Sequence, residues 1–297
     1  MQTNKHFLDA FFNPSSIAVV GASNNFFSLN FNLFANLVRL GYQGDIYPVN
    51  PNASEVFGIK AYRSLRDIEP DIALVVSAVP ANKTLEVVKD CVDKKVKCMV
   101  LVSGGFSEIG EHGLRMQDEV AQVLKQNEIR AIGPNTLSPI NSANNMVISF
   151  YPVKKLRKGN ASFIFQSGMY DLRLSWLFED FHLGVSKIID LGNKMDINEV
   201  DALEYLSHDS DTKAIGIHLE IIRGDSRRFI QLLKDSSGKK PIVVLKTGST
   251  EAGVKAAASH TGSMVRGSDV VFDGVLKQAG AIRAQNLDEF FDLVKPR

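Results

Sequence analysis

The sequence has few cysteines, and they form no recognisable motif. Only two of its 297 residues are cysteine, Cys91 and Cys98, and they are not spaced as a C-x-x-C pair. Metal sites and redox motifs of cysteine need closer or more numerous thiols. We therefore expect no metal site and interpret both residues as small apolar side chains in the core of a protein of the reducing cytoplasm.

The sequence also lacks a charge excess and a long hydrophobic run. The 34 Lys and Arg residues are balanced by 33 Asp and Glu, whereas a nucleic-acid-binding protein usually shows a basic surplus. The longest apolar stretches, such as residues 72–81, are far shorter than the ~20 residues that cross a bilayer. Residues 1–12 lack the basic-then-apolar pattern of a signal peptide. We expect neither nucleic acid nor a membrane as partner.

What the sequence does contain is an alternation of short Val- and Ile-rich runs with helical patterns, typical of α/β proteins with parallel sheets. In the first half, the predicted strands are 16–20, 45–49, 72–77, 97–102 and 129–132, and the predicted helices are 33–40, 83–94 and 113–126. In the second half, the predicted strands are 161–165, 187–190, 214–219, 241–245 and 281–283, and the predicted helices are 172–181, 199–207, 227–234 and 268–278.

A basic segment separates the two halves. Residues 151–159 (YPVKKLRKG) include a proline and end in glycine, which is typical of an exposed linker. The chain length suits two domains of ~150 residues. We therefore predict two α/β domains with largely parallel sheets, over residues 1–152 and 153–297.

A glycine follows the first predicted strand. Gly21 precedes a predicted helix, and backbone N–H groups at such a turn can hold a phosphate. The dinucleotide fingerprint G-x-G-x-x-G is incomplete, because Ser23 and Phe26 stand at its other glycine positions. NAD also favours an acid after the second strand, where this sequence has Asn50. A tight turn without a ligand remains an alternative, but a phosphate-bearing nucleotide other than NAD fits best.

Glycine, proline and small residues also follow the third, fourth and fifth predicted strands. Ligands of open α/β sheets bind at the carboxyl ends of the strands, and these residue types present backbone to a long, flat ligand. The segments are 77–80 (SAVP), 103–108 (SGGFSE) and 132–135 (IGPN). Each is a weak signal alone, because ordinary turns use the same residues.

Four motifs together resemble the NDP-forming acyl-CoA synthetases, which include the alpha subunits of ADP-forming acetyl-CoA synthetase and, more distantly, of succinyl-CoA synthetase. They are 12–23 (FNPSSIAVVGAS), 46–51 (IYPVNP), 104–108 (GGFSE) and 132–135 (IGPN), in the family's order. The resemblance implies a Rossmann-like CoA-binding domain followed by a flavodoxin-like ligase domain. The expected contacts of coenzyme A are Gly21, Ala22, Ser23, Asn50, Pro51, Val79, Pro80, Ser103 and Gly104, with Asn135 near the thioester end.

One histidine has unusual neighbours. His260 lies in residues 256–263 (AAASHTGS), where small residues would leave its imidazole uncovered. This pattern alone leaves both a catalytic histidine and a polar loop histidine open. The family forms a phosphohistidine at Ser-His-Thr-Gly, so the resemblance implies that His260 is the nucleophile. It also implies that Glu220 orients the imidazole and that Ser167 and Gly168 bind phosphate at a helix start.

Some positions depart from the family's pattern. Asn30 and Thr136 stand where glycine and cysteine are usual, and Asp171 and Ile221 replace glycines near the expected phosphate site. A carboxylate in the first turn of a helix competes with phosphate for the same positive helix end. Asp171 therefore keeps open an alternative, a catalytically degenerate CoA-binding regulatory subunit or sensor. Residues 191–201 (LGNKMDINEVD) are family-like as well, and we interpret them mainly as structural.

The sequence contains no ATP-grasp-like region. The resemblance therefore implies that Mg-ADP or Mg-ATP binds to an ATP-grasp beta-type partner subunit in a hetero-oligomer. The expected reaction is acyl-CoA + phosphate + ADP ⇌ acid + CoA + ATP, with a small-molecule acid or acyl-CoA as substrate.

Overall fold

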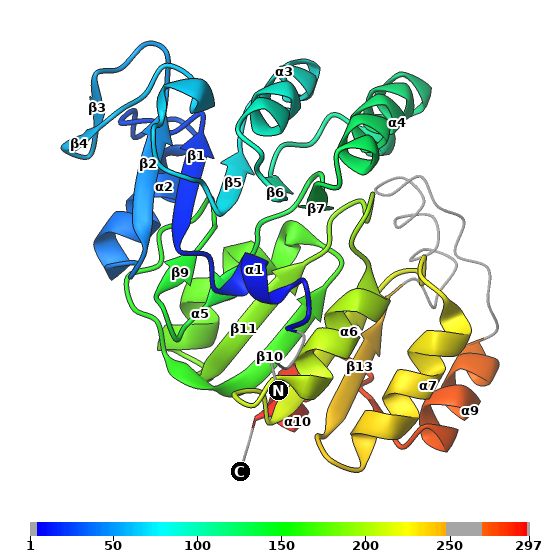
Figure 1. The fold of residues 1–297 in the computed structure, drawn as a ribbon. Helices are drawn as coiled ribbons and strands as arrows, with labels where there is room; N and C mark the ends of the chain where they lie inside the picture. The colour runs from blue at the N-terminus through cyan, green and yellow to red at the C-terminus, as the bar shows by residue number, and fades with distance from the viewer. Residues whose placement is uncertain (1–4, 248–268, 296–297) are drawn as a thin grey trace.

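The computed structural model describes residues 5–247 and 269–295, in which two sheets share a hydrophobic core (Figure 1). The first sheet has the order β2-β1-β5-β6-β7, and all its strand pairs are parallel. Its strands are β1 (Ser16–Val20), β2 (Asp45–Val49), β5 (Leu74–Ser77), β6 (Cys98–Leu101) and β7 (Arg130–Ile132). The helices of this half are α1 (Asp9–Phe12), α2 (Phe31–Leu40), α3 (Ala81–Asp93) and α4 (Glu111–Gln126).

Both faces of the first sheet are buried, which is why its strands are continuous apolar runs. Successive side chains of a strand point to opposite faces, so Ile17 and Val19 join one core cluster and Ala18 joins another. Leu33 and Leu37 of α2 cover the first face, and α3 and α4 cover the second. Cys91 and Cys98 are buried free thiols in these clusters, as predicted.

The second sheet has the order β14-β13-β12-β10-β11-β8-β9, in which β8 and β9 are antiparallel and the other pairs are parallel. Its strands are β8 (Ile140–Asn141), β9 (Met146–Val147), β10 (Lys158–Phe165), β11 (Val185–Asp190), β12 (Ala214–Leu219), β13 (Ile242–Lys246) and β14 (Ile282–Arg283). Its helices are α5 (Leu174–Glu179), α6 (Glu199–His208), α7 (Ser226–Ser237), α9 (Asp269–Gln278) and α10 (Leu287–Val294). Short elements are β3 (Glu55–Val56), β4 (Ile59–Lys60), η1 (Leu65–Asp67), η2 (Ser107–Ile109) and η3 (Gly168–Arg173).

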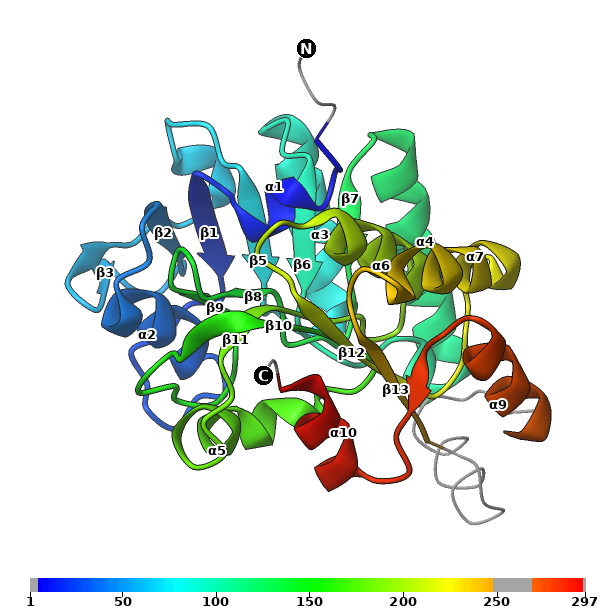
Figure 2. The same ribbon diagram turned by 90° about the horizontal axis from the view of Figure 1, so that it is seen from below.

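Helices cover both faces of the second sheet as well. Figure 2 shows α6 and α7 on the face toward the first sheet and α5 and α10 on the other. Successive residues of β10 point to these two faces. Ile164 joins the core shared with the first sheet, and Phe163 packs with Phe290 and Phe291 of α10. The α/β architecture with two largely parallel sheets, predicted from the sequence, is confirmed.

Only part of the segment 151–159 is the exposed linker that the sequence predicts. Strand β10 already begins at Lys158, and Val153 is fully buried. The Val153 N–H donates to Asn36 Oδ1 over 3.1 Å, and Asn36 Nδ2 donates to the Tyr151 carbonyl over 2.9 Å. A single buried valine among basic residues produces no periodicity, so this anchor could not be predicted from the sequence.

Two further differences concern short elements. Strands β8 and β9 were not predicted, and they pair with β11 although they precede residue 152. Two-residue strands are too short to show an alternating pattern. The division of the chain at residue 152 stays a prediction. The helix predicted over 172–181 is instead the 3-10 segment η3 followed by the six-residue α5.

Candidate functional site

The carboxyl ends of three strands of the first sheet meet where the sequence predicts the ligand. Val20 is in register with Val49 of β2 and with Ser77 of β5. The Gly21 N–H donates to the Val49 carbonyl over 2.9 Å, and the Ala78 N–H donates to the Val20 carbonyl over 2.9 Å. Gly21 has φ +89°, a conformation that a side chain would strain. The predicted turn after β1 therefore lies at a shared edge of the sheet.

A cavity of 460 Å³ opens at this edge. Of the residues predicted to contact coenzyme A, Gly21, Asn50, Pro51 and Val79 line it. The rest of its wall combines apolar and charged side chains. The remaining lining residues are Val20, Val49, Arg63, Ser64, Leu65, Lys83, Glu86, Val87 and Asp90. The predicted contacts Ala22, Ser23, Pro80, Ser103 and Gly104 are not among the lining residues.

Two basic residues of this cavity, Arg63 and Lys83, were not predicted from the sequence. Tyr62 forms a parallel bridge with Val49, and the Asn50 N–H donates to the Tyr62 carbonyl over 2.8 Å, so Arg63 follows beside the end of β2. Lys83 lies in the first turn of α3. The helix dipole disfavours a cation at this position. A lysine in the first turn of α3 was therefore the one signal in the sequence that an anion binds nearby. Among the described residues, the ion pair of Lys83 is a long one of 3.8 Å with Glu86. The side chains of Arg63, Lys83 and Glu86 are exposed.

Two asparagines fix the backbone around Gly21. Asn50 Nδ2 donates to the Ala22 carbonyl over 2.8 Å and so joins the β2 end to the turn after β1. Asn30 Nδ2 donates to the carbonyls of Gly21, over 3.2 Å, and Ala78, over 2.9 Å. The unexpected asparagine at position 30 therefore bridges the ends of β1 and β5.

A second group of predicted residues meets at the ends of β6 and β7. The Asn135 N–H donates to the Ser103 carbonyl over 3.0 Å. A Cβ on Gly104 would lie 3.2 Å from Asn135 Oδ1 and 2.9 Å from Glu108 Oε1, so only glycine fits easily there. Glu108 accepts hydrogen bonds from the N–H groups of Gly105, over 2.5 Å, and Phe106, over 3.1 Å. The structure thus brings Ser103, Gly104 and Asn135 together, away from the 460 Å³ cavity.

In the second sheet, Glu220 directly follows β12, as predicted, and its side chain is buried. The Glu220 and Ile221 N–H groups donate to Gln166 Oε1 over 2.9 and 3.1 Å. Lys194 Nζ also donates to this oxygen, over 3.0 Å, and pairs with Glu199 Oε2 at 2.6 Å. The segment that carries Glu220 is therefore held by a buried polar network that the sequence analysis did not predict.

The predicted phosphate-binding residues border a much smaller space. Ser167 and Gly168 line a cavity of 10 Å³ with Asp190, which has room for about one water. Burial raises the pKa of Asp190 to about 6, although the Leu137 and Gly192 N–H groups donate to its carboxylate. The α-helix begins only at Leu174, so the residues after Gly168 form a 3-10 turn and not the predicted α-helix start.

A buried histidine near Glu220 was also missed. His218 packs edge-on against Tyr170, with ring centroids 4.9 Å apart, and Thr247 Oγ1 lies 3.2 Å from its Nε2. Burial, together with the positive charge of Lys194, lowers the pKa of His218 to about 4. His218 is therefore neutral at pH 7 and belongs to the packed interior of the second sheet.

Two sequence predictions lie outside what the structure describes. His260 falls between the described ranges 5–247 and 269–295, so its role stays a prediction. The side chain of Asp171 is likewise outside the described part, although its backbone belongs to η3. Thr136, another departure, is buried and its hydroxyl donates to the Asp190 carbonyl over 2.5 Å.

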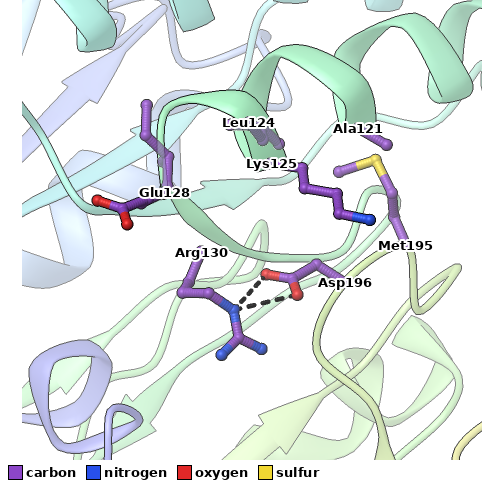
Figure 3. Close-up of a pocket in the computed structure, with 8 residues that line it drawn as sticks. Ala121, Leu124, Lys125, Glu128, Arg130, Met195 and Asp196 are labelled. Atoms are coloured by element: carbon purple, nitrogen blue, oxygen red, sulfur yellow. Dashed lines mark hydrogen bonds and ion pairs between the residues drawn. The ribbon is translucent and has the colours of Figure 1, made fainter.

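A further cavity, of 440 Å³, lies at the amino end of β7 and so at the opposite edge of the first sheet (Figure 3). Its most prominent charges neutralise each other, because Arg130 Nε lies 2.8 and 3.1 Å from the carboxylate oxygens of Asp196. Asp196 also accepts from the Ala131 N–H over 2.8 Å, and Arg130 lies over the Phe7 ring. We interpret this pair as a link between the two halves.

The described residues, 5–247 and 269–295, include neither a membrane-spanning helix nor a cluster of His, Cys, Asp and Glu that could bind a metal.

Two protein-family models match the chain in succession. Residues 15–141 match a CoA binding domain, and residues 158–296 match a succinyl-CoA ligase like flavodoxin domain. The order of these domains and the expected fold of each are thereby confirmed.

Relatives of known identity cover nearly the whole chain. An ADP-forming acetate–CoA ligase II of Archaeoglobus fulgidus is 41% identical over 96% of this chain and 42% of its own length. The alpha subunit of the ADP-forming acetate–CoA ligase II of Pyrococcus furiosus is 39% identical over 97% of this chain and 62% of its own length. A solved structure of dinucleotide-forming acetyl-coenzyme A synthetase 1 from Ca. Korarchaeum cryptofilum, in complex with phosphate and ADP, superposes with a TM-score of 0.90. That chain is 36% identical, and the match covers 97% of this chain and 61% of that one. The present chain thus spans only part of the length of each.

Proposed function

We propose that the chain belongs to the NDP-forming acyl-CoA synthetase family and acts as the CoA-binding, phosphohistidine-bearing alpha-type part of such an enzyme. The observation that carries this proposal is the joint edge of β1, β2 and β5, where a cavity of 460 Å³ lies over Gly21. The reaction is acyl-CoA + phosphate + ADP ⇌ acid + CoA + ATP.

The first sheet supplies the binding site for coenzyme A. Its diphosphate lies at the turn of Gly21, Ala22 and Ser23, where backbone N–H groups follow a strand and precede α2. The apolar wall of the cavity receives the adenosine end, and Arg63 and Lys83 receive the phosphate on the ribose. The pantetheine then runs past Val79 and Pro80 toward Ser103, Gly104 and Asn135, which share the same edge of the sheet.

The second domain supplies the phosphoryl chemistry. An oxygen of inorganic phosphate attacks the thioester carbon, the C–S bond breaks, and the thiolate of coenzyme A takes a proton. His260 then attacks the phosphorus of the acyl phosphate, which releases the carboxylate and leaves a phosphohistidine. Glu220 orients the imidazole, while Ser167 and Gly168 bind phosphate on their solvent-facing side.

The nucleotide step requires a second polypeptide region. ADP attacks the phosphohistidine, the P–N bond breaks, and ATP and neutral histidine result. We propose that Mg-ADP is held by an ATP-grasp beta-type subunit in a hetero-oligomer, because the Pyrococcus furiosus relative is named as one subunit of its enzyme. The free thiols Cys91 and Cys98 fit our proposal that the reaction takes place in the cytoplasm.

Radioactive labelling tests the proposal. The chain is mixed with acetyl-CoA and [32P]phosphate in the presence of the partner subunit, without ADP, and acid-labile label on the protein is counted. We expect the wild-type chain to be labelled and the His260→Asn variant to stay unlabelled, while both bind CoA equally. Equal labelling of the two proteins would show that another residue carries the phosphoryl group. CoA binding without any label would favour the alternative, a regulatory subunit or sensor.

A further inference from the structure

A strap of the second domain lies along the edge strand of the first sheet. We call residues 191–197 the strap. Its N–H groups of Asn193, Met195 and Ile197 donate to the carbonyls of Pro134, over 2.9 Å, Gly133, over 3.1 Å, and Ala131, over 3.3 Å. At Gly192 a Cβ would lie 2.2 Å from the Pro134 carbonyl oxygen, so the two segments touch. The strap therefore fixes the second domain against the carboxyl end of β7.

Asn193 connects the strap to the first domain. Its Nδ2 donates to Glu108 Oε2 over 2.6 Å and to Gln117 Oε1 over 3.1 Å. The other carboxylate oxygen of Glu108 accepts from the N–H groups of Gly105 and Phe106. Burial opposes the ionisation of Glu108, but these hydrogen bonds outweigh it and hold the pKa of Glu108 below its ordinary value. Asn193 thus supports the glycine loop that follows β6.

Lys194, the next residue, connects the strap to the Glu220 segment. Its side chain is 1% exposed, and its ammonium donates to Gln166 Oε1, to Glu199 Oε2 and, over 2.6 Å, to the Ile221 carbonyl. An ammonium has three protons, so its donor capacity is filled. Glu199 also holds the Glu220 segment directly, because its Oε1 accepts from the Arg223 and Gly224 N–H groups over 2.7 Å each.

A buried ion pair is a poor device for stability alone, because well-packed apolar residues often stabilise a core as much or more. Here the pair has one geometric consequence that apolar residues could not provide. Through Gln166, Glu199 and the Ile221 carbonyl it fixes five backbone groups between residues 220 and 224. We propose that Asn193 and Lys194 are positioning residues. They hold the loop of Gly104 and Gly105, next to the expected CoA site, and the Glu220 carboxylate in a fixed position relative to each other. This inference rests on the proposed function of Glu220.

A matched pair of double variants tests the role of Lys194. In Lys194→Met/Glu199→Gln the charges are removed and the acceptor for Arg223 and Gly224 is kept. The control is Lys187→Met/Asp209→Asn, because Lys187 is equally buried, pairs with Asp209 at 2.9 Å and lies in the same domain. We expect both proteins to fold with a lowered Tm and to bind CoA within about threefold of wild type. The rate of labelling by acetyl-CoA and [32P]phosphate should fall about 10- to 100-fold only in the Lys194 variant.

Asn193→Leu tests the other half of the strap. Since Asn193 supports the CoA-side loop, we expect the KM for acetyl-CoA to rise several-fold with a smaller change in kcat. Lys194→Met/Glu199→Gln should instead lower kcat with little change in KM. Asn127→Leu, which loses a hydrogen bond within α4, is the control and should leave both constants unchanged. If the two strap variants change kcat and KM no more than their controls do, the strap is only structural and the inference is wrong.

Hydrogen exchange separates this inference from the proposed function. In the Lys194 variant, the amides of Glu220 and Ile221 should lose protection, because the Lys194 ammonium no longer holds their acceptor Gln166. The same amides should stay protected in the Lys187 variant. Unchanged protection would overturn the inference even if catalysis falls. If instead the wild-type chain is never labelled while this segment does lose protection, the positioning is right and the proposed reaction is wrong.

Discussion

The two halves of the candidate site are built in opposite ways. At the first sheet, the residues around the turn of Gly21 leave a cavity of 460 Å³, and Lys83 at its rim forms a long, exposed ion pair with Glu86. At the second sheet, the space beside Ser167 and Gly168 is 10 Å³, and the charges of Lys194 and Glu199 are buried and fully hydrogen-bonded. The first half is open, with a cavity and a weakly paired cation. The second half is filled, with packed side chains and hydrogen-bonded charges.

This difference matches what each half has to do. A binding site for a large anionic ligand needs space and cations that lack strong partners, because the ligand supplies both the volume and the countercharge. A group-transfer site needs side chains that are held before the substrate arrives, because a misplacement of 1 Å can cost about 100-fold in rate.

Removal of a buried charge in the filled half should be the most damaging change. Glu199→Ala leaves the Lys194 ammonium buried without its countercharge and releases the Arg223 and Gly224 N–H groups. We expect the free energy of unfolding to fall by about 3–5 kcal/mol, as measured by urea denaturation. Glu86→Ala, at the rim of the open cavity, is the control and should change it by less than about 0.5 kcal/mol. A loss in Glu199→Ala as small as in this control would contradict the described network.

The pH dependence of stability should reveal two buried groups in the filled half. His218 has a folded-state pKa of about 4, below its ordinary value of 6.5, so the unfolded chain binds more protons and its contribution is lost as pH falls from 6.5 to 4. Asp190 has a folded-state pKa of about 6, above its ordinary value of 3.8, so its contribution is lost as pH rises from 3.8 to 6. Each effect amounts to about 3 kcal/mol, and the two oppose each other.

His218→Leu should unmask the Asp190 effect. Relative to wild type, the variant should gain about 3 kcal/mol of stability as pH is lowered from 6.5 to 4, by urea denaturation at several pH values. His112→Leu, a substitution of an exposed histidine of α4, is the control and should parallel wild type. Parallel curves for His218→Leu and wild type would mean that folding does not lower the pKa of His218.

In the open half, loss of a cation should weaken ligand binding without loss of stability. We expect Arg63→Ala and Lys83→Ala each to lower the affinity for CoA about tenfold, or about 1.4 kcal/mol, in calorimetric titrations. Dephospho-CoA, which lacks the ribose phosphate, should bind wild type and variants alike. Lys89→Ala, on the same helix but outside the cavity lining, is the control. Equal affinity of wild type for CoA and dephospho-CoA would show that Arg63 and Lys83 do not bind the ribose phosphate.

The smallest effect is expected where the sequence departs from the family at the turn. Asn30 bridges the Gly21 and Ala78 carbonyls and stands beside the expected diphosphate. Asn30→Gly should open this space and raise CoA affinity about threefold, or about 0.7 kcal/mol. Asn32→Gly, in the same helix, removes a hydrogen bond to the Phe150 carbonyl and should leave affinity unchanged. A large loss of affinity in Asn30→Gly would assign Asn30 to the binding site itself.

Local patterns in the sequence predicted much of the fold and of the open half. Apolar runs ended by glycine or proline located β1, β2, β5 and β6 within a few residues, and Gly21, Asn50 and Val79 do line one cavity. Glu220 also closes its predicted strand. Arg63 could not be located in this way, because its place depends on the bridge between Tyr62 and Val49.

The filled half was harder to predict because its contacts join distant parts of the chain. Gln166, Lys194 and Ile221 meet through hydrogen bonds that span 27 to 55 residues, and no spacing rule connects them. The motif 191–201 therefore looked merely structural. The 3-10 turn after Gly168 was mistaken for the start of a helix, because the apolar residues of η3 and α5 continue one periodic pattern.

The central claim is that the open half binds coenzyme A. Because the two halves share a core, the measurement uses the full chain, titrated calorimetrically with CoA and, separately, with NAD. The account predicts saturable binding of CoA and far weaker binding of NAD, since Asn50 offers no carboxylate to the ribose hydroxyls of NAD. Tighter binding of NAD than of CoA, or no binding of CoA at millimolar concentration, would contradict the account.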